Sequence, residues 1–201
     1  MPRLYTLSVL EVRELGKRFG DRWIFRGLCF ELIQGDKLVV GGRNGSGKST
    51  LLKVLARLLT PSEGVVGGPE GDYRIVLALS ALDQALYPHL TVREHLDFAS
   101  EVRGCAARAD ELLIRVGLID ASDRLAALLS TGMRSRLRLA LAIQPKPRLL
   151  LLDEPSASLD KEGRELVESI CEEQAEWGCL ILATNDPEER RLANLELELV
   201  N

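Results

Sequence analysis

The chain has 201 residues, 46% of them hydrophobic, and a formal net charge of −4. This length suits one globular domain that buries a sizeable core, and the acidic balance gives no reason to expect a nucleic-acid partner. No apolar run approaches the ~20 residues that span a bilayer, and no charged-then-apolar leader opens the chain. We therefore expect a cytosolic protein, with any membrane part supplied by a partner.

The first quarter of the chain predicts three extended stretches and a helix. Residues 7–19 alternate loosely between apolar and polar side chains, as in a strand with one solvated face. Residues 23–32 resemble a second strand, and residues 38–40 a short buried one after a tight turn. Residues 50–56 then place apolar side chains at helical spacing.

The middle of the chain predicts a loop, a strand and three helices. Residues 61–71 are rich in glycine and leave room for one short edge strand, and residues 75–79 have the apolar run of a buried strand. Thr91 and Glu94 have the spacing of a capping box, which marks a helix start. The expected helices cover residues 91–102, 106–116 and 133–143.

The last third returns to alternating strands and helices. Residues 149–152 are four consecutive leucines, typical of a central parallel strand buried on both faces. Residues 161–176 form an amphipathic helix closed by Gly178, and residues 179–183 form another buried strand. Strands interleaved with helices indicate an α/β fold with a mostly parallel sheet.

The expected organisation is a single domain over residues 1–201. The three consecutive helices suggest a helical subdomain, about residues 85–145, inserted into the parallel core. The extended stretches at the N-terminal end are expected to form a separate antiparallel β subdomain.

Residues 42–49 read Gly-Arg-Asn-Gly-Ser-Gly-Lys-Ser and fit G-x-x-x-x-G-K-[ST], the phosphate-binding loop of nucleoside triphosphatases. A strand before the loop and a helix after it aim backbone N–H groups and the helix N-terminus at one point, which suits a polyphosphate. Lys48 would reach the β- and γ-phosphates, and the Ser49 hydroxyl would bind Mg²⁺. The remaining residues of the predicted cradle are Asn44, Gly45, Ser46, Gly47 and Thr50.

Two acids follow the leucine run. An apolar strand that ends in Asp153 and Glu154 delivers both carboxylates to the carboxyl edge of the sheet, where open α/β sheets bind ligands. Asp153 would hold Mg²⁺, directly or through water. Glu154 would act as the general base that polarises the attacking water.

Further segments resemble the motifs of the ATP-binding cassette (ABC) ATPases, over nearly the whole chain. Residues 130–133, Ser-Thr-Gly-Met, taken alone fit a serine N-cap, but in this setting they resemble the ABC signature of exporter-type members. Residues 155–160 resemble the loop after the paired acids, with Asp160 as its key residue. Phe19 resembles the aromatic that stacks on adenine, and Trp23 and Tyr5 remain alternatives.

The resemblance implies that ATP and Mg²⁺ bind between two subunits arranged head to tail. Ser130 and the Gly132 N–H of one subunit would meet the γ-phosphate held by the other, and Asp160 would link the two sites. It also implies an integral membrane permease as partner, with this chain at the cytoplasmic face of the membrane. The pair could be a homodimer or a heterodimer with another ABC ATPase.

The family usually has a glutamine just after the strand that precedes the helical subdomain, where it contacts Mg²⁺ and the attacking water. Gln84 is the one glutamine nearby, and it is the candidate for this role. The register of the sequence instead puts Leu82 or Asp83 at the usual spacing. The alternative for Gln84 is a solvated loop residue.

The family usually has histidine after the last buried strand, where this chain has Asn185. The asparagine amide is a neutral donor on a shorter arm, so it reaches a γ-phosphate less directly. Removing one preorganised donor from a charged transition state costs about 10²–10³ in rate. We expect slow hydrolysis sustained by Glu154.

Within the family the chain resembles the small exporter ATPases, with the haem-exporter ATPases of cytochrome c maturation as the nearest likeness. Two other functions stay open. One is a soluble ABC ATPase outside transport, although the second cassette or long coiled-coil insertion usual there is missing from this sequence. The other is a module that dimerises on ATP with little or no hydrolysis.

Overall fold

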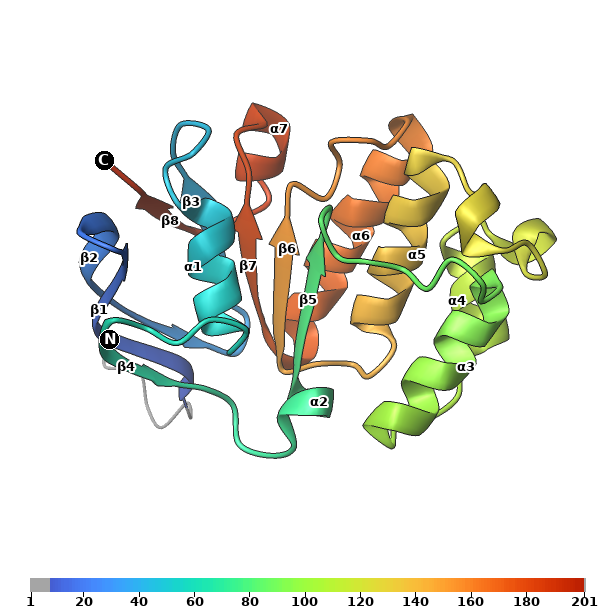
Figure 1. Cartoon of the computed structure of the whole chain (residues 1–201), viewed down its shortest axis with the longest axis horizontal. Coiled ribbons are helices and arrows are strands. Elements are labelled where there is room, and N and C mark those ends of the chain that lie inside the picture. The colour runs from blue at the N-terminus through green and yellow to red at the C-terminus, as the bar shows by residue number, and fades with distance from the viewer. Residues whose placement is uncertain (1–7, 201) are drawn as a thin grey trace.

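The computed structural model describes residues 8–200 of the chain. A five-stranded parallel sheet of order β5-β6-β7-β3-β8 lies beside a three-stranded antiparallel sheet of order β2-β1-β4 (Figure 1). The parallel strands are β3 (Lys37–Gly41), β5 (Leu77–Ala81), β6 (Leu149–Asp153), β7 (Cys179–Ala183) and β8 (Leu195–Glu198). The antiparallel strands are β1 (Ser8–Phe19), β2 (Arg22–Ile33) and β4 (Glu63–Gly67).

Helices connect and cover these strands. They are α1 (Lys48–Leu55), α2 (Tyr73–Val76), α3 (Val92–Arg103), α4 (Ala109–Arg115), α5 (Thr131–Ile143), α6 (Lys161–Trp177) and α7 (Pro187–Arg190), with 3-10 turns at Ile119–Ala121 and Ala126–Leu128. The expected α/β fold, with a parallel core and an antiparallel N-terminal sheet, is confirmed. The connection between β5 and β6 carries α3, α4 and α5, where the sequence predicted a helical subdomain.

The central strands are buried on both faces, as their unbroken apolar sequence predicted. Leu150 and Leu152 of β6 pack with the helices of the β5–β6 connection and with α6, whereas Leu149 and Leu151 pack with α1 and the antiparallel sheet. Successive side chains of a strand point to opposite faces, so one short run of leucines joins two hydrophobic clusters. This double burial is what holds the carboxyl end of β6 in place.

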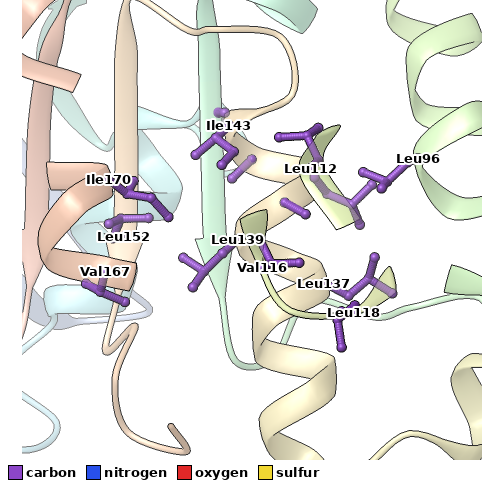
Figure 2. Close-up of a cluster of buried hydrophobic side chains, with 14 of the residues drawn as sticks. Leu96, Leu112, Val116, Leu118, Leu137, Leu139, Ile143, Leu152, Val167 and Ile170 are labelled. Atoms are coloured by element: carbon purple, nitrogen blue, oxygen red, sulfur yellow. The ribbon is translucent and has the colours of Figure 1, made fainter. Parts of the chain in front are cut away.

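The helices of the β5–β6 connection share the larger cluster (Figure 2). Members of this cluster include Leu96, Leu112, Val116, Leu118, Leu137, Leu139, Ile143, Leu152, Val167 and Ile170. The predicted capping box starts α3: Thr91 Oγ1 accepts from the Glu94 N–H at 3.1 Å, and Glu94 Oε2 accepts from the Thr91 N–H at 2.7 Å. Packing against β6 and α6 therefore ties these helices to the core sheet.

Several boundaries differ from those expected, and some elements were not expected at all. The strand predicted at residues 75–79 is β5, Leu77–Ala81, because the Asp72 side chain accepts from the Arg74 N–H at 3.0 Å and starts the short helix α2. The helix predicted at 106–116 begins only at Ala109. Helix α7 and strand β8 were missed, although the alternating Leu-Glu-Leu-Glu of β8 is the period-2 pattern of an edge strand.

Residues 8–200 include no helix with both the length and the apolar composition that crossing a bilayer requires.

We predict that Leu139→Ala lowers the free energy of unfolding by about 2–5 kcal/mol, because it removes a side chain that is 1% exposed and leaves a cavity. The matched control is Ile114→Ala on α4, whose side chain is 65% exposed, and its effect should lie within about 0.5 kcal/mol. Urea denaturation followed by circular dichroism measures both. Equal effects of the two substitutions would contradict the packing described here.

Candidate nucleotide site

The phosphate-binding loop joins β3 to α1 at the carboxyl edge of the parallel sheet (Figure 1). Gly47, which precedes α1, has φ of 105°, and a Cβ there would lie 2.4 Å from Ile24 Cγ2. Gly42 has φ of 137°, and a Cβ there would lie 2.5 Å from Ser46 Oγ. Both positions therefore demand glycine for backbone conformation and for space. The turn leaves the first N–H groups of α1 directed at the loop, an arrangement that suits an anion.

Lys48 is almost fully buried, with 7% of its surface exposed. Its Nζ donates to the Gly42 carbonyl at 2.7 Å and lies 3.8 Å from Glu154 Oε1. A buried cation needs compensating partners. Here they are the Gly42 carbonyl, the Asn185 side-chain amide and the more distant Glu154 carboxylate. Phosphate oxygens would be stronger partners for this ammonium than the carbonyl. The position of Lys48 suits a lysine that binds phosphate, and that role stays a prediction.

Ser49 and Asp153 form the second part of the site. Asp153 ends β6 and is 9% exposed. Burial raises the pKa of its carboxyl above the usual value, while a hydrogen bond with the Ser49 side chain opposes the rise. Within the described residues, Asp153 Oδ1 is buried and has no hydrogen-bond partner. A carboxylate oxygen without a partner, beside a hydroxyl, is the oxygen donor set that Mg²⁺ prefers, so these residues fit the predicted ion.

Glu154 follows Asp153 with φ of 48°, a left-handed conformation that is strained for a side chain with a Cβ. Its N–H donates to the Ala183 carbonyl at 2.9 Å, which anchors the sharp turn to β7. Burial raises the pKa of the Glu154 carboxyl, and Lys48 and the Asn185 N–H oppose the rise, whereas the charges of Glu189 and Asp153 add to it. A carboxylate with raised proton affinity, aimed at the phosphate loop, suits a general base.

Asn185 lies against the same loop, just after β7. Its side-chain Nδ2 donates to the Gly42 carbonyl at 2.6 Å and its Oδ1 accepts from Lys48 Nζ at 3.0 Å, in the amide orientation that satisfies both groups. The side-chain amide of Asn44 lies 2.8 Å from this amide. Asn185 therefore contacts the lysine that would hold the terminal phosphates, and its donation to a γ-phosphate stays a prediction.

The other cradle residues lie around the same turn. Ser46 is buried, and its Oγ has no hydrogen-bond partner among residues 8–200, which leaves a hydroxyl available to a ligand. Thr50 belongs to the first turn of α1. Gly45 is exposed at the tip of the loop with φ of 82°.

The signature segment lies at the same edge of the sheet but away from the phosphate loop of its own chain (Figure 1). The Ser130 side chain caps α5 by accepting from the Met133 N–H at 3.2 Å, and Ser130 itself is exposed. Gly132 lies so close to the Ser158 carbonyl that a Cβ there would be 3.1 Å from that oxygen. The start of α5 thus packs against the loop after Glu154 and still presents its N-terminus outward.

Asp160 has two partners within its own chain. Its carboxylate caps α6 by accepting from the Gly163 N–H at 2.9 Å, and it pairs with Arg136 of α5 at 2.6 Å. The capping bond and the guanidinium hold the pKa of Asp160 below its usual value. Arg136 was missed at the sequence level, because an arginine on an amphipathic helix face carries no local signal of its partner.

Gln84 is not joined to the phosphate loop. Its carbonyl accepts from Arg138 Nε at 2.9 Å, and its Oε1 is buried without a hydrogen-bond partner in the described part of the chain. Asp83 influences the site electrostatically, since its charge is among those that raise the pKa of Asp153. Its carboxylate also pairs with Lys53 at 2.5 Å. The glutamine role of Gln84 stays a prediction, with Leu82 or Asp83 as the alternatives that the register indicates.

Phe19 ends β1 with 51% of its surface exposed. The Lys17 ammonium lies 4.9 Å from the centre of its ring. The guanidinium groups of Arg18 and Arg26 lie 5.7 and 4.6 Å from the centre of the Trp23 ring. The exposed face of Phe19 keeps it a candidate for stacking on a base, whereas Tyr5 lies outside the described residues.

Comparison with known proteins agrees with this geometry. The profile of the ABC transporter family matches residues 25–157. The cytochrome c biogenesis ATP-binding export protein CcmA 2 of Cupriavidus metallidurans is 39% identical over 190 residues, which cover 89% of this chain and 90% of that protein. The taurine import ATP-binding protein TauB of Mesorhizobium japonicum is 42% identical over 150 residues, 68% of this chain and 57% of that protein.

Solved structures share the fold. An ATP-binding subunit of an ABC transporter has a TM-score of 0.87 and 25% identity, covering 95% of this chain and 85% of that one. A dimeric ATP-binding cassette in a post-hydrolysis state, bound to ADP and Pi, has a TM-score of 0.84 at 20% identity, which supports the fold alone. The matched profile, the similar sequences and the phosphate loop agree, and the chain belongs to the ABC transporter family as an ATP-binding, ATP-hydrolysing subunit.

Proposed function

We propose that this chain powers a membrane exporter that serves cytochrome c biogenesis, with haem as the cargo. The observation that carries the hydrolytic part is the convergence of Lys48, Asp153 and Glu154 on one edge of the sheet, with 3.8 Å between Lys48 Nζ and Glu154 Oε1. Export is supported by the similarity to CcmA 2, which extends over nearly all of both proteins. The similarity to the taurine importer spans little more than half of that protein.

The residues divide the work in this proposal. Lys48 and the N–H groups of the phosphate loop bind the β- and γ-phosphates, and Phe19 stacks on adenine. Ser49 and Asp153 would hold Mg²⁺, which supplies charge neutralisation on the phosphate oxygens. Glu154 orients the attacking water and takes its proton, and its burial strengthens it as a base. Asn185 shares the Lys48 ammonium and so helps to place it.

The working unit in this proposal is a head-to-tail pair with two ATP molecules between the subunits. The exposed Ser130 and the outward N-terminus of α5 support this arrangement, because an uncovered helix N-terminus attracts the γ-phosphate of a facing subunit. Loss of the γ-phosphate would remove charge from the seam and let the pair open. An integral membrane permease would bind the pair and place it at the cytoplasmic face of the membrane.

We predict that Lys48→Ala and Glu154→Gln separate binding from hydrolysis. Lys48→Ala should weaken Mg-ATP binding more than about tenfold, since it removes a charge-assisted contact to phosphate. Glu154→Gln should keep the affinity within about twofold and lower phosphate release about 10²–10⁴-fold, because the proton acceptor is gone. Calorimetry and a phosphate-release assay measure the two effects. If wild type and Glu154→Gln both bind ATP but release no phosphate, the chain is a dimerising module instead.

Asn185→His should raise the turnover number about tenfold or more, because a longer donor restores direct contact with the γ-phosphate. The matched control is Asn185→Ala, which removes the amide that shares Lys48 and should lower turnover. A steady-state ATPase assay at saturating ATP compares the three proteins. An unchanged rate in the histidine variant would show that the asparagine does not limit hydrolysis.

Deletion of the gene for this chain should abolish covalent haem in c-type cytochromes, because haem delivery would lose its energy source. Wild-type protein should restore haem-stained c-type cytochromes, whereas Glu154→Gln should fail to restore them at equal expression. The protein should also pellet with membranes only when its permease is co-expressed. Normal c-type cytochromes in the deletion strain would exclude haem as the cargo. Sedimentation of the protein with ribosomes rather than with membranes would favour an ATPase outside transport.

A further inference from the structure

Glu189 is a buried carboxylate to which the proposed reaction assigns no contact with nucleotide, although its charge adds to the raised pKa of Glu154. Glu189 belongs to α7, four residues after Asn185, and 6% of its surface is exposed. Among the described residues, no lysine, arginine or histidine makes an ion pair with it. Its Oε1 accepts one hydrogen bond, from the Ser156 N–H at 3.1 Å. Burial of an unpaired carboxylate costs free energy, so stability alone favours a neutral side chain at this position.

Ser156 belongs to the connecting loop, defined here as residues 155–160, which runs from Glu154 to α6. Ser156 is 3% exposed, and its carbonyl accepts from the Leu159 N–H at 3.0 Å. The far end of the loop is held by Asp160, through its bonds to Gly163 and Arg136. Glu189 therefore provides the side-chain anchor at the near end of the loop, two residues after the proposed base.

Helix α7 is itself held firmly against the core. Asp186 at its start pairs with Arg164 of α6 at 2.9 Å, and Arg190 at its end pairs with Glu198 of β8 at 3.0 Å. The segment continues directly from Asn185 at the end of β7. A rigid α7 thus gives Glu189 a fixed position from which to hold the connecting loop.

We propose that Glu189 is a positioning residue for ATP hydrolysis: its carboxylate oxygen fixes the Ser156 N–H and thereby the connecting loop. The connecting loop contacts two parts of the proposed site, the base Glu154 and the signature segment. It starts from Glu154, and its Ser158 carbonyl packs against Gly132 at the start of α5. Release of Ser156 would let the base and the signature segment shift together. This inference rests on the proposed roles of Glu154 and Gly132.

Two substitutions separate the hydrogen bond from the charge. Glu189→Gln keeps the length and an oxygen acceptor but removes the charge, and Glu189→Asp keeps the charge on an arm one carbon shorter. The full-length Gln variant should lose less than about tenfold in turnover, through the lowered pKa of Glu154 alone. The Asp variant should lose more, about 10- to 100-fold, because a small misplacement of the loop disturbs the reacting groups. The KM for ATP should change less than about twofold in both, because the phosphate loop is untouched.

Hydrogen exchange tests the anchor without any nucleotide. The peptide that contains residues 155–160 should exchange faster in the Asp variant than in wild type and should be unchanged in the Gln variant. Matched thermal unfolding midpoints exclude global destabilisation. Unchanged turnover in the Asp variant would overturn the proposal. So would a turnover that is lower in the Gln variant than in the Asp variant. If wild type itself failed to hydrolyse ATP, the proposed function would fall, and the exchange rates would still decide whether Glu189 anchors the loop.

Discussion

The buried ammonium of Lys48 is the centre around which the rest of the site is arranged. Its nearest partners are the Gly42 carbonyl, the Asn185 amide and, farther off, the Glu154 carboxylate. These groups arrive from β3, β7 and β6, which are adjacent strands of one parallel sheet. A cation with so little water around it must be compensated by whatever lies close, and none of these partners provides the charge density of a triphosphate. The groups around Lys48 therefore leave its ammonium suited to bind an anion.

The double burial of β6 and β7 makes this arrangement possible. Alternate leucines of β6 belong to two different hydrophobic clusters, so the strand is clamped from both faces and its carboxyl end has little freedom. That rigidity allows the chain to hold Glu154 at φ of 48°, a conformation that a loosely packed turn would relax. The strain turns the carboxylate away from the strand direction and toward Lys48. Packing far from the site thus sets the direction of the proposed base.

The loop after Glu154 connects the parts that a second subunit would meet. Its Ser158 carbonyl touches Gly132, its Asp160 pairs with Arg136 of the signature helix, and Ser156 is held by Glu189. Each contact joins segments that are distant in the sequence. These contacts form a continuous series of packed groups from the phosphate end of the sheet to the start of α5, one route by which a change at either end can reach the other.

The sequence by itself determined the phosphate loop, the paired acids, the capped helix starts and the buried strands, because each depends on residues within a few positions of one another. It left open which residue after β5 serves the site: the Gln84 carbonyl accepts from Arg138, whereas the charge of Asp83 helps to raise the pKa of Asp153. It also gave no sign of Arg136 or Glu189, whose partners lie 24 and 33 residues away. Only the tertiary structure decides such pairs, because a charged side chain on a helix has the same local pattern whether it faces solvent or a distant loop.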